Sequence, residues 1–136
     1  MTMQLNPYLT FPGTAGEAMD YYADVLGGTV RVMTFKDAGM DVPGVMHAAL
    51  ETPAGFHIFA SDQFEGMGPD LVQGTNMQMS ISGDDEPAMR GYWERLSAEG
   101  QVVMPLEKQM WGDVYGLVTD RFGISWHINI AGDAAP

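Results

Sequence analysis

The residues best suited to chemistry lie in the last apolar stretch of the sequence, residues 122–130. His127 stands two positions from both Ser125 and Asn129, and apolar side chains alternate with these three. Such alternation is typical of a β-strand with one packed and one solvated face. An imidazole between a hydroxyl and an amide can bind a ligand, hold a metal or move a proton. His127 is therefore the best candidate for a catalytic residue, although a hydrogen-bonded cavity histidine is the favoured interpretation.

Three other side chains have both a chemical and a structural interpretation. His57 fits a solvated strand position and a pocket wall equally well, and the side of the strand on which His47 lies is open, with a structural role as the first interpretation. Trp111, beside Gly112, is able to close over a ligand or to plug a loop against the sheet or a dimer partner. The sequence alone does not choose between these roles.

The composition excludes several classes of partner. The chain has 136 residues, 46% of them hydrophobic, which suits a single domain. Its net charge of -12 and pI near 4.2, without any basic cluster, predict no nucleic acid and no membrane surface as a partner. Without cysteine there is no disulfide, thiolate nucleophile or cysteine zinc site. The absence of a leader-like or long apolar segment favours a cytoplasmic protein.

Hydrophobic periodicity predicts two similar sets of elements. The first set has strands at 5–11, 29–35, 45–51 and 56–61, with a helix that begins at a capping box, Thr14 to Glu17. The second set has strands at 75–81, 101–106, 113–119 and 124–130, with a helix that begins at 84–87. The predicted loop between them, residues 62–74, is long enough to act as a lid, a partner contact or a mobile segment.

The two sets are an internal repeat. Ala18-Met19 with Tyr22 and Leu26 matches Ala88-Met89 with Tyr92 and Leu96 at an offset of 70 residues (88 − 18). In the hairpins Gly55 matches Gly123 at an offset of 68 (123 − 55), which lays His57 on Ser125 and Phe59 on His127. Each half is therefore expected to be a βαβββ module, the first about 1–62 and the second about 75–131, within one domain of 1–136. A sheet covered by one helix leaves its other face bare, so we expect two modules to pair, within the chain or across a homodimer.

Short motifs run through nearly the whole chain. They are Pro7 to Phe11, Leu26-Gly27-Gly28, Val45 to Ala48, Met104-Pro105-Leu106, Trp111 to Gly116, and Phe122-Gly123 with Trp126. Together they resemble the PhnB-like branch of the vicinal oxygen chelate superfamily, which includes glyoxalase I, bleomycin-resistance proteins and extradiol dioxygenases. The resemblance implies an α+β fold in which two βαβββ modules form paired, mostly antiparallel curved sheets with the helices on the convex side.

The resemblance also implies where a metal would bind. In metal-using members, the first strand of each module carries one ligand and the last strand carries another, usually His and Glu. The matching positions here are Asn6, Phe59, Asn76 and His127. Phenylalanine cannot ligate, and amides are weak ligands for transition metals. We therefore predict no cofactor and no metal centre of the family type, with a divalent metal held by other ligands as the open alternative.

Strands of period two would give the paired sheets a polar concave floor. We expect the ligand-binding residues to be Tyr8, His57, Phe59, Asn76, Gln78, Trp111, Tyr115 and His127. We expect the opposite faces to pack under the helices, with Leu5, Leu9, Phe11, Ile58, Met77, Met79, Ile81, Trp126 and Ile128.

Three functions from different classes follow from this pattern. The favoured one is a homodimer that binds a small organic molecule in a metal-free polar cavity. The alternative is a glyoxalase-like enzyme, of the lyase, isomerase or dioxygenase class, in which His127 with His57 or His47 moves a proton on a carbonyl substrate, with or without a divalent metal. The third is a scaffold whose cavity is vestigial. Methyl transfer, which has been attached to this branch by name, is disfavoured because the sequence has no glycine-rich nucleotide loop between a strand and a helix.

Overall fold

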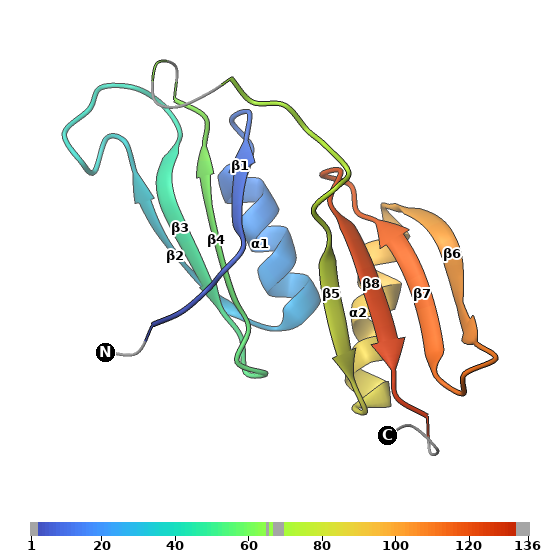
Figure 1. Ribbon diagram of the computed structural model, residues 1–136. Coiled ribbons are helices and arrows are strands. Elements are labelled where there is room, and N and C mark those ends of the chain that lie inside the picture. Colours follow the sequence, from blue (N-terminus) through green and yellow to red (C-terminus); the bar gives the residue numbers. More distant parts are fainter. Residues whose placement is uncertain (1–2, 65, 67–69, 133–136) are drawn as a thin grey trace. The chain divides into compact units, whose positions relative to one another are not determined.

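The computed structural model describes residues 3–64, 66 and 70–132, which form two compact units divided between Val72 and Gln73. The first unit contains β1 (Tyr8–Phe11), α1 (Ala15–Leu26), β2 (Thr29–Thr34), β3 (Val45–Glu51) and β4 (His57–Asp62). The second contains β5 (Met79–Gly83), α2 (Glu86–Ala98), β6 (Gln101–Lys108), β7 (Val114–Thr119) and β8 (Ser125–Ile130) (Figure 1). The predicted α+β class and the two βαβββ modules are confirmed. Neither helix of the described chain has the length and apolar character needed to cross a membrane.

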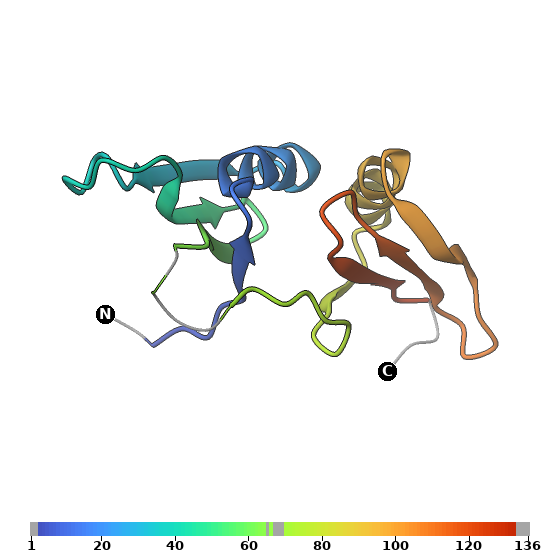
Figure 2. The same ribbon diagram turned by 90° about the horizontal axis from the view of Figure 1, so that it is seen from above.

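The two sheets have the same topology. Their strand orders are β1-β4-β3-β2 and β5-β8-β7-β6, so the first strand of each unit pairs with the last. These two pairings, β1 with β4 and β5 with β8, are parallel, and the others are antiparallel. Each helix lies along one face of its own sheet (Figure 2). Each sheet therefore has a helix-covered face and an open face, as the repeat predicted.

Side chains alternate between these faces along the central strands. In β4 and in β8 every second residue is buried, beginning with Ile58 and Trp126. The open faces carry the residues between them. In the first unit the open face includes Tyr8, Thr10, His47, Phe59 and Ser61, and in the second it includes Ser80, Tyr115, Ser125, His127 and Asn129. Buried partners under the helices are Phe11, Met19, Tyr22, Leu50 and Ile58 in the first unit, and Ile81, Met89, Leu96, Val118, Trp126 and Ile128 in the second.

The hairpins that lead into β4 and β8 repeat closely. Thr52 and Asp120 occupy matching positions. The backbone N–H of each donates to the carbonyl of the fourth residue after it, and the carbonyl of each accepts from the N–H of the glycine three residues after it. Gly55 and Gly123 adopt φ values of 90° and 87°, a region that favours glycine. The side chain of Thr52 also accepts a bond from Phe56 N at 2.9 Å. The 68-residue offset found in the sequence is thus an offset between equivalent turns.

Two predicted strands begin later than expected. The strands predicted at 5–11 and 75–81 begin at Tyr8 and Met79, and the side chains of Leu5 and Met77 are 100% and 84% exposed. The prediction that these two side chains pack under the helices is wrong. The parallel partner of Met79 is Trp126, one residue into β8, so nothing on β8 lies opposite the segment before Gln78. In the first unit Pro7 has no N–H to continue the ladder, although its carbonyl accepts a bond from Phe59 N at 3.0 Å.

The start of α1 is held differently from the prediction. Thr14 is the N-cap residue but its side chain makes no capping bond, so the predicted capping box is wrong. Instead, Asp62 at the end of β4 accepts a bond from Ala15 N at 2.8 Å and another from Val45 N at 2.9 Å. A carboxylate is a stronger acceptor than a hydroxyl, and it ties the helix to two strands. At α2 the predicted acidic N-terminus is confirmed, since Asp85 caps Ala88 N at 3.2 Å.

Candidate functional site

His127 is the centre of a hydrogen-bonded cluster on the open face of the second unit. Its Nδ1 lies 2.7 Å from Tyr115 Oη on β7, and its Nε2 lies 2.5 Å from Gln78 Oε1, just before β5. The Tyr115 ring stacks on the imidazole at 5.8 Å with an interplanar angle of 25°. Trp111, between β6 and β7, lies 6.2 Å from the Tyr115 ring and is 57% exposed. We call these four residues the His127 cluster.

The hydrogen bonds define the tautomer of His127. An amide oxygen can only accept, so Nε2 must donate its proton to Gln78. In the neutral imidazole Nδ1 is then an acceptor, and it receives the O–H of Tyr115. Both ring nitrogens are therefore used within the protein, and the phenol oxygen keeps its lone pairs for a further partner.

The open face of the first unit carries a second aromatic cluster, formed by Tyr8, His47 and Phe59. Tyr8 Oη lies 3.2 Å from His47 Nδ1. The ring centroids are 5.3 Å apart for His47 and Phe59, and 6.3 Å apart for Tyr8 and Phe59. The sequence did not determine on which side of its strand His47 lies. In the structure it lies on the same side of the sheet as Phe59. We call these three residues the His47 cluster.

The two clusters occupy equivalent positions. The hairpin offset of 68 carries His47 to Tyr115 (115 − 47) and Phe59 to His127 (127 − 59), and in both units a tyrosine and a histidine on different strands share a hydrogen bond. The sequence repeat contained this signal, because His47 and Tyr115 lie at the same offset as the aligned glycines. Each open face is therefore a hydrogen-bonded aromatic surface.

The remaining predicted residues lie apart from these clusters. Asn6 precedes β1, and its amide donates to Gln4 Oε1 at 3.1 Å. Asn76 is exposed in a bend ahead of β5. His57 is partly buried at the start of β4, on the same face as Phe59 and opposite Glu51 in the β3–β4 ladder. Within the described residues, none of these three is hydrogen-bonded to either cluster. The structure brings together Gln78, Tyr115, Trp111 and His127 and, separately, Tyr8 and Phe59.

The positions that the resemblance assigns to metal ligands do not fit a divalent metal. Asn6 and Asn76 offer amides, Phe59 is a member of the His47 cluster, and both nitrogens of His127 are hydrogen-bonded. In the described residues there is also no group of three or more His, Cys, Asp or Glu side chains close enough to hold an ion. The chemistry of these donors is that of a hydrogen-bonding surface.

Asp113 ties the open face of the second unit to the turn before β7. Its carboxylate accepts bonds from Asn129 Nδ2 and from Gly132 N, each at 2.9 Å. The bond from Asn129 and then that from Gly132 lower the pKa of Asp113 below its ordinary value of 3.8, with a smaller effect from Trp111. Asp113 thereby orients a polar side chain two residues from His127.

The lowered pKa of Asp113 predicts a specific dependence of stability on pH. A carboxyl whose pKa is lower in the folded state stabilises the fold fully above its unfolded pKa, near 3.8, and loses this contribution as the pH falls through the folded value. We expect the difference in the free energy of unfolding between the wild type and Asp113→Asn to be constant near neutral pH. The difference should shrink as the pH falls below the ordinary pKa of 3.8. Urea denaturation from neutral pH to about pH 2.5 measures it. A difference independent of pH would contradict the assignment.

The first unit also contains a cavity of about 410 Å³ that was not predicted. It lies at the end of β1 and β4, next to the predicted loop at 62–74, of which residues 65 and 67–69 are outside the described residues. Tyr8 belongs both to the His47 cluster and to its wall. The residues that line the cavity are Tyr8, Thr10, Phe35, Met46, Ser61, Asp62, Gln63, Phe64, Asp70, Leu71 and Val72.

Known proteins share both the sequence pattern and the fold. Residues 3–129 match the family described as 3-demethylubiquinone-9 3-methyltransferase. Protein PA1353 from Pseudomonas aeruginosa is 32% identical in sequence, with a TM-score of 0.81 over 97% of this chain and 100% of that one. A putative 3-demethylubiquinone-9 3-methyltransferase, PhnB protein, from Bacillus cereus is 20% identical, with a TM-score of 0.77 over 95% of this chain and 100% of that one.

A third structure places this fold in a wider group. A glyoxylase/bleomycin resistance protein/dioxygenase domain from Frankia sp. EAN1pec has 17% identity and a TM-score of 0.69 over 98% of this chain and 95% of that one. At that identity the likeness concerns the fold alone. The family match covers nearly the whole described chain, including β1 and most of β8. The chain belongs to the family described as 3-demethylubiquinone-9 3-methyltransferase, and its fold is that of the PhnB protein and of the glyoxylase/bleomycin resistance protein/dioxygenase domain.

Proposed function

We propose that this protein binds a small organic molecule on its polar open faces, as a homodimer and without a metal centre of the family type. The observation that carries the proposal is the presence, on both open faces, of a tyrosine and a histidine joined by a hydrogen bond and surrounded by partly exposed rings. Such surfaces offer stacking and a few fixed polar groups, as small-molecule sites do. The proposed ligand-binding residues remain Tyr8, His57, Phe59, Asn76, Gln78, Trp111, Tyr115 and His127.

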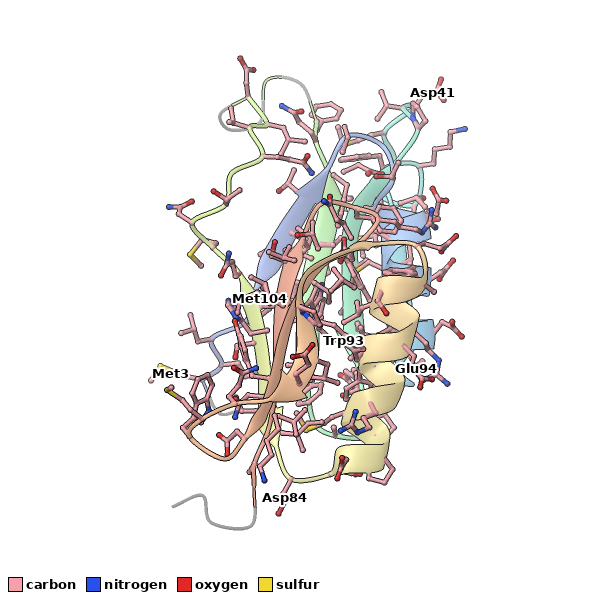
Figure 3. The ribbon with its side chains drawn as sticks, turned by 90° about the vertical axis from the view of Figure 1, so that its right-hand side faces the viewer. Met3, Asp41, Asp84, Trp93, Glu94 and Met104 are labelled. Atoms are coloured by element: carbon pink, nitrogen blue, oxygen red, sulfur yellow. The ribbon has the colours of Figure 1, made fainter. Side chains whose placement is uncertain are left out.

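Assembly and location belong to the same proposal. We propose that the two units act as one domain. A cytoplasmic location is consistent with a chain that has no cysteine and therefore needs no oxidising compartment. Apolar side chains on the edge strand β6 support a second copy as partner, since Val102, Val103 and Met104 are 44%, 53% and 45% exposed. Figure 3 labels Met104 on this strand. Light scattering after size-exclusion chromatography at micromolar concentration is expected to give twice the mass of one chain, and a monomer would contradict this part.

The ligand-binding part is tested with His127→Ala and a broad library of small organic molecules. A ligand that binds the folded state raises the melting temperature, and we expect His127→Ala to remove most of that shift for ligands of the second unit. The control is Glu94→Ala on the exposed side of α2 (Figure 3), which should keep the full shift. Full stabilisation of His127→Ala would exclude His127 as a binding group. A library in which no compound shifts the wild type would contradict the function itself.

The short bond between Tyr115 and His127 favours a second candidate, proton transfer on a carbonyl substrate. At 2.7 Å an imidazole and a phenol can exchange a proton, and a positioned acid–base group typically contributes a rate factor on the order of 10² or more. If this function holds, the wild type catalyses deuterium exchange next to the carbonyl of a small ketone or 2-oxo acid, and Tyr115→Phe slows it at least tenfold. Exchange followed by NMR measures this, and equal rates in both proteins would exclude it.

Methyl transfer, which the family description names, is not part of the proposal. The connections between strand and helix, residues 12–14 and 84–85, are too short to contain a glycine-rich nucleotide loop. The polar and aromatic residues of the open faces support binding and proton transfer instead.

A further inference from the structure

We propose that the cavity of the first unit is a binding site for a small aromatic amine. The inference rests on the proposed function and deepens it, because the wall of this cavity includes Tyr8, Thr10 and Ser61 of the open face of the first unit. Its volume of about 410 Å³ lies within the range of roughly 300–1,000 Å³ that is usual for small-molecule sites. The described residues of its wall all belong to the first unit.

One part of the wall is suited to an aromatic ring. The rings of Phe35 and Phe64 are in contact, with centroids 5.0 Å apart and an interplanar angle of 39°. Phe35 is 4% exposed, so its position is fixed by the core, while Phe64 and the flexible side chain of Met46 are partly exposed. A planar ligand can add a third ring to this pair and a contact with the methionine sulfur.

The wall also contains polar and anionic residues. Thr10 and Ser61 are paired residues of β1 and β4, and Gln63 follows Ser61 by two positions, so the wall offers hydroxyl and amide groups. Among the described residues of the wall, the ionisable groups are the phenol of Tyr8 and the carboxyls of Asp62 and Asp70, without any Lys, Arg or His. A protein of net charge -12 adds to this field. The charge favours a cation and disfavours an anion.

The two carboxyls have different roles. Asp62 is 6% exposed, and its oxygens accept the backbone bonds from Ala15 and Val45, so it maintains the shape of the cavity. Asp70 is exposed and makes no hydrogen bond or ion pair with the described part of the chain. Asp70 is therefore the group available to pair with a ligand ammonium, while the ring of the ligand lies on Phe64.

Three indole compounds test the site, because they share a ring and differ in charge. Tryptamine is cationic, N-acetyltryptamine is neutral and indole-3-acetate is anionic at neutral pH. Titration calorimetry with the full chain is expected to rank their affinities in that order. Asp70→Asn should weaken tryptamine roughly three- to fivefold and leave N-acetyltryptamine unchanged, since it removes one exposed charge pair. Phe64→Ala should weaken both compounds roughly tenfold, and Phe64→Leu less.

The controls separate this inference from the proposed function. Asp41→Asn removes an exposed carboxyl outside the cavity (Figure 3) and should leave all three affinities unchanged. Circular dichroism establishes that each variant is folded. Absence of binding by the three compounds, an anion bound as tightly as the cation, or insensitivity to both Asp70→Asn and Phe64→Ala would overturn the inference. Binding lost only in His127→Ala would also overturn it, yet would leave the proposed function standing.

Discussion

Replacement of Asp120 by alanine is expected to lower the free energy of unfolding by about 3–6 kcal/mol. The side chain is 4% exposed and accepts at least three hydrogen bonds. Oδ1 accepts from Phe122 N at 2.8 Å and Ile124 N at 3.1 Å, and Oδ2 accepts from Trp126 Nε1 at 2.8 Å. The buried indole N–H left without an acceptor costs about 1–3 kcal/mol, and each of the two part-buried backbone N–H groups costs about 1–1.5 kcal/mol. Because Trp126 directly precedes His127, the same change should disturb the His127 cluster.

The repeat supplies the control for this experiment. Thr52 occupies the matching turn position in the first unit but accepts only one side-chain bond, from Phe56 N at 2.9 Å. Thr52→Ala should therefore cost about 0.5–1.5 kcal/mol, in line with a single ordinary hydrogen bond. Urea denaturation of both variants gives the comparison. Equal losses in the two turns would show that the three bonds of Asp120 do not stabilise the fold as described.

The elements that could be predicted from the sequence are those with a strong local pattern. The helices follow from apolar spacing. As predicted, α1 ends at Gly27 and α2 begins after the acidic residue Asp85. Strands β3, β7 and β8 have the predicted positions within one residue, because alternation and flanking turns define them. The repeat, read from the helix spacing and the hairpin glycines, led directly to the module and to the family.

What could not be predicted depends on partners distant in sequence. Apolar alternation continues through Leu5 and Met77, but the first strand stops at Pro7, which has no N–H for the ladder, and the other stops where β8 offers no further partner. The cap of α1 comes from Asp62, which lies 47 residues after Ala15, so the local Thr14 pattern was misleading. The sequence also gives no sign that the side chains of Phe35 and Phe64 meet.

In the candidate site, too, the residues with a local sequence pattern could be predicted and the others could not. Strand alternation placed His127, Gln78 and Tyr115 among the predicted ligand-binding residues. The structure joins these three side chains by hydrogen bonds. His47 could have been added from the 68-residue offset to Tyr115, since equivalent strand positions lie on equivalent faces. The cavity could not be predicted, because part of its wall comes from the segment after β4, and the sequence of this segment has no periodic pattern that would give its position.

Replacement of Asp62 by alanine is expected to cost about 2–6 kcal/mol, because two buried backbone donors, Ala15 N and Val45 N, lose their acceptor. Asp62→Asn keeps one acceptor oxygen but turns an N–H₂ toward the other donor, so its loss should be intermediate. Asp24→Ala on the exposed face of α1 should stay within about 0.5 kcal/mol of the wild type. Urea denaturation ranks the three variants, and a loss in Asp62→Ala no larger than in Asp24→Ala would contradict the bridging role. Since Asp62 also lines the cavity, a folded Asp62→Asn should bind tryptamine more weakly than the wild type.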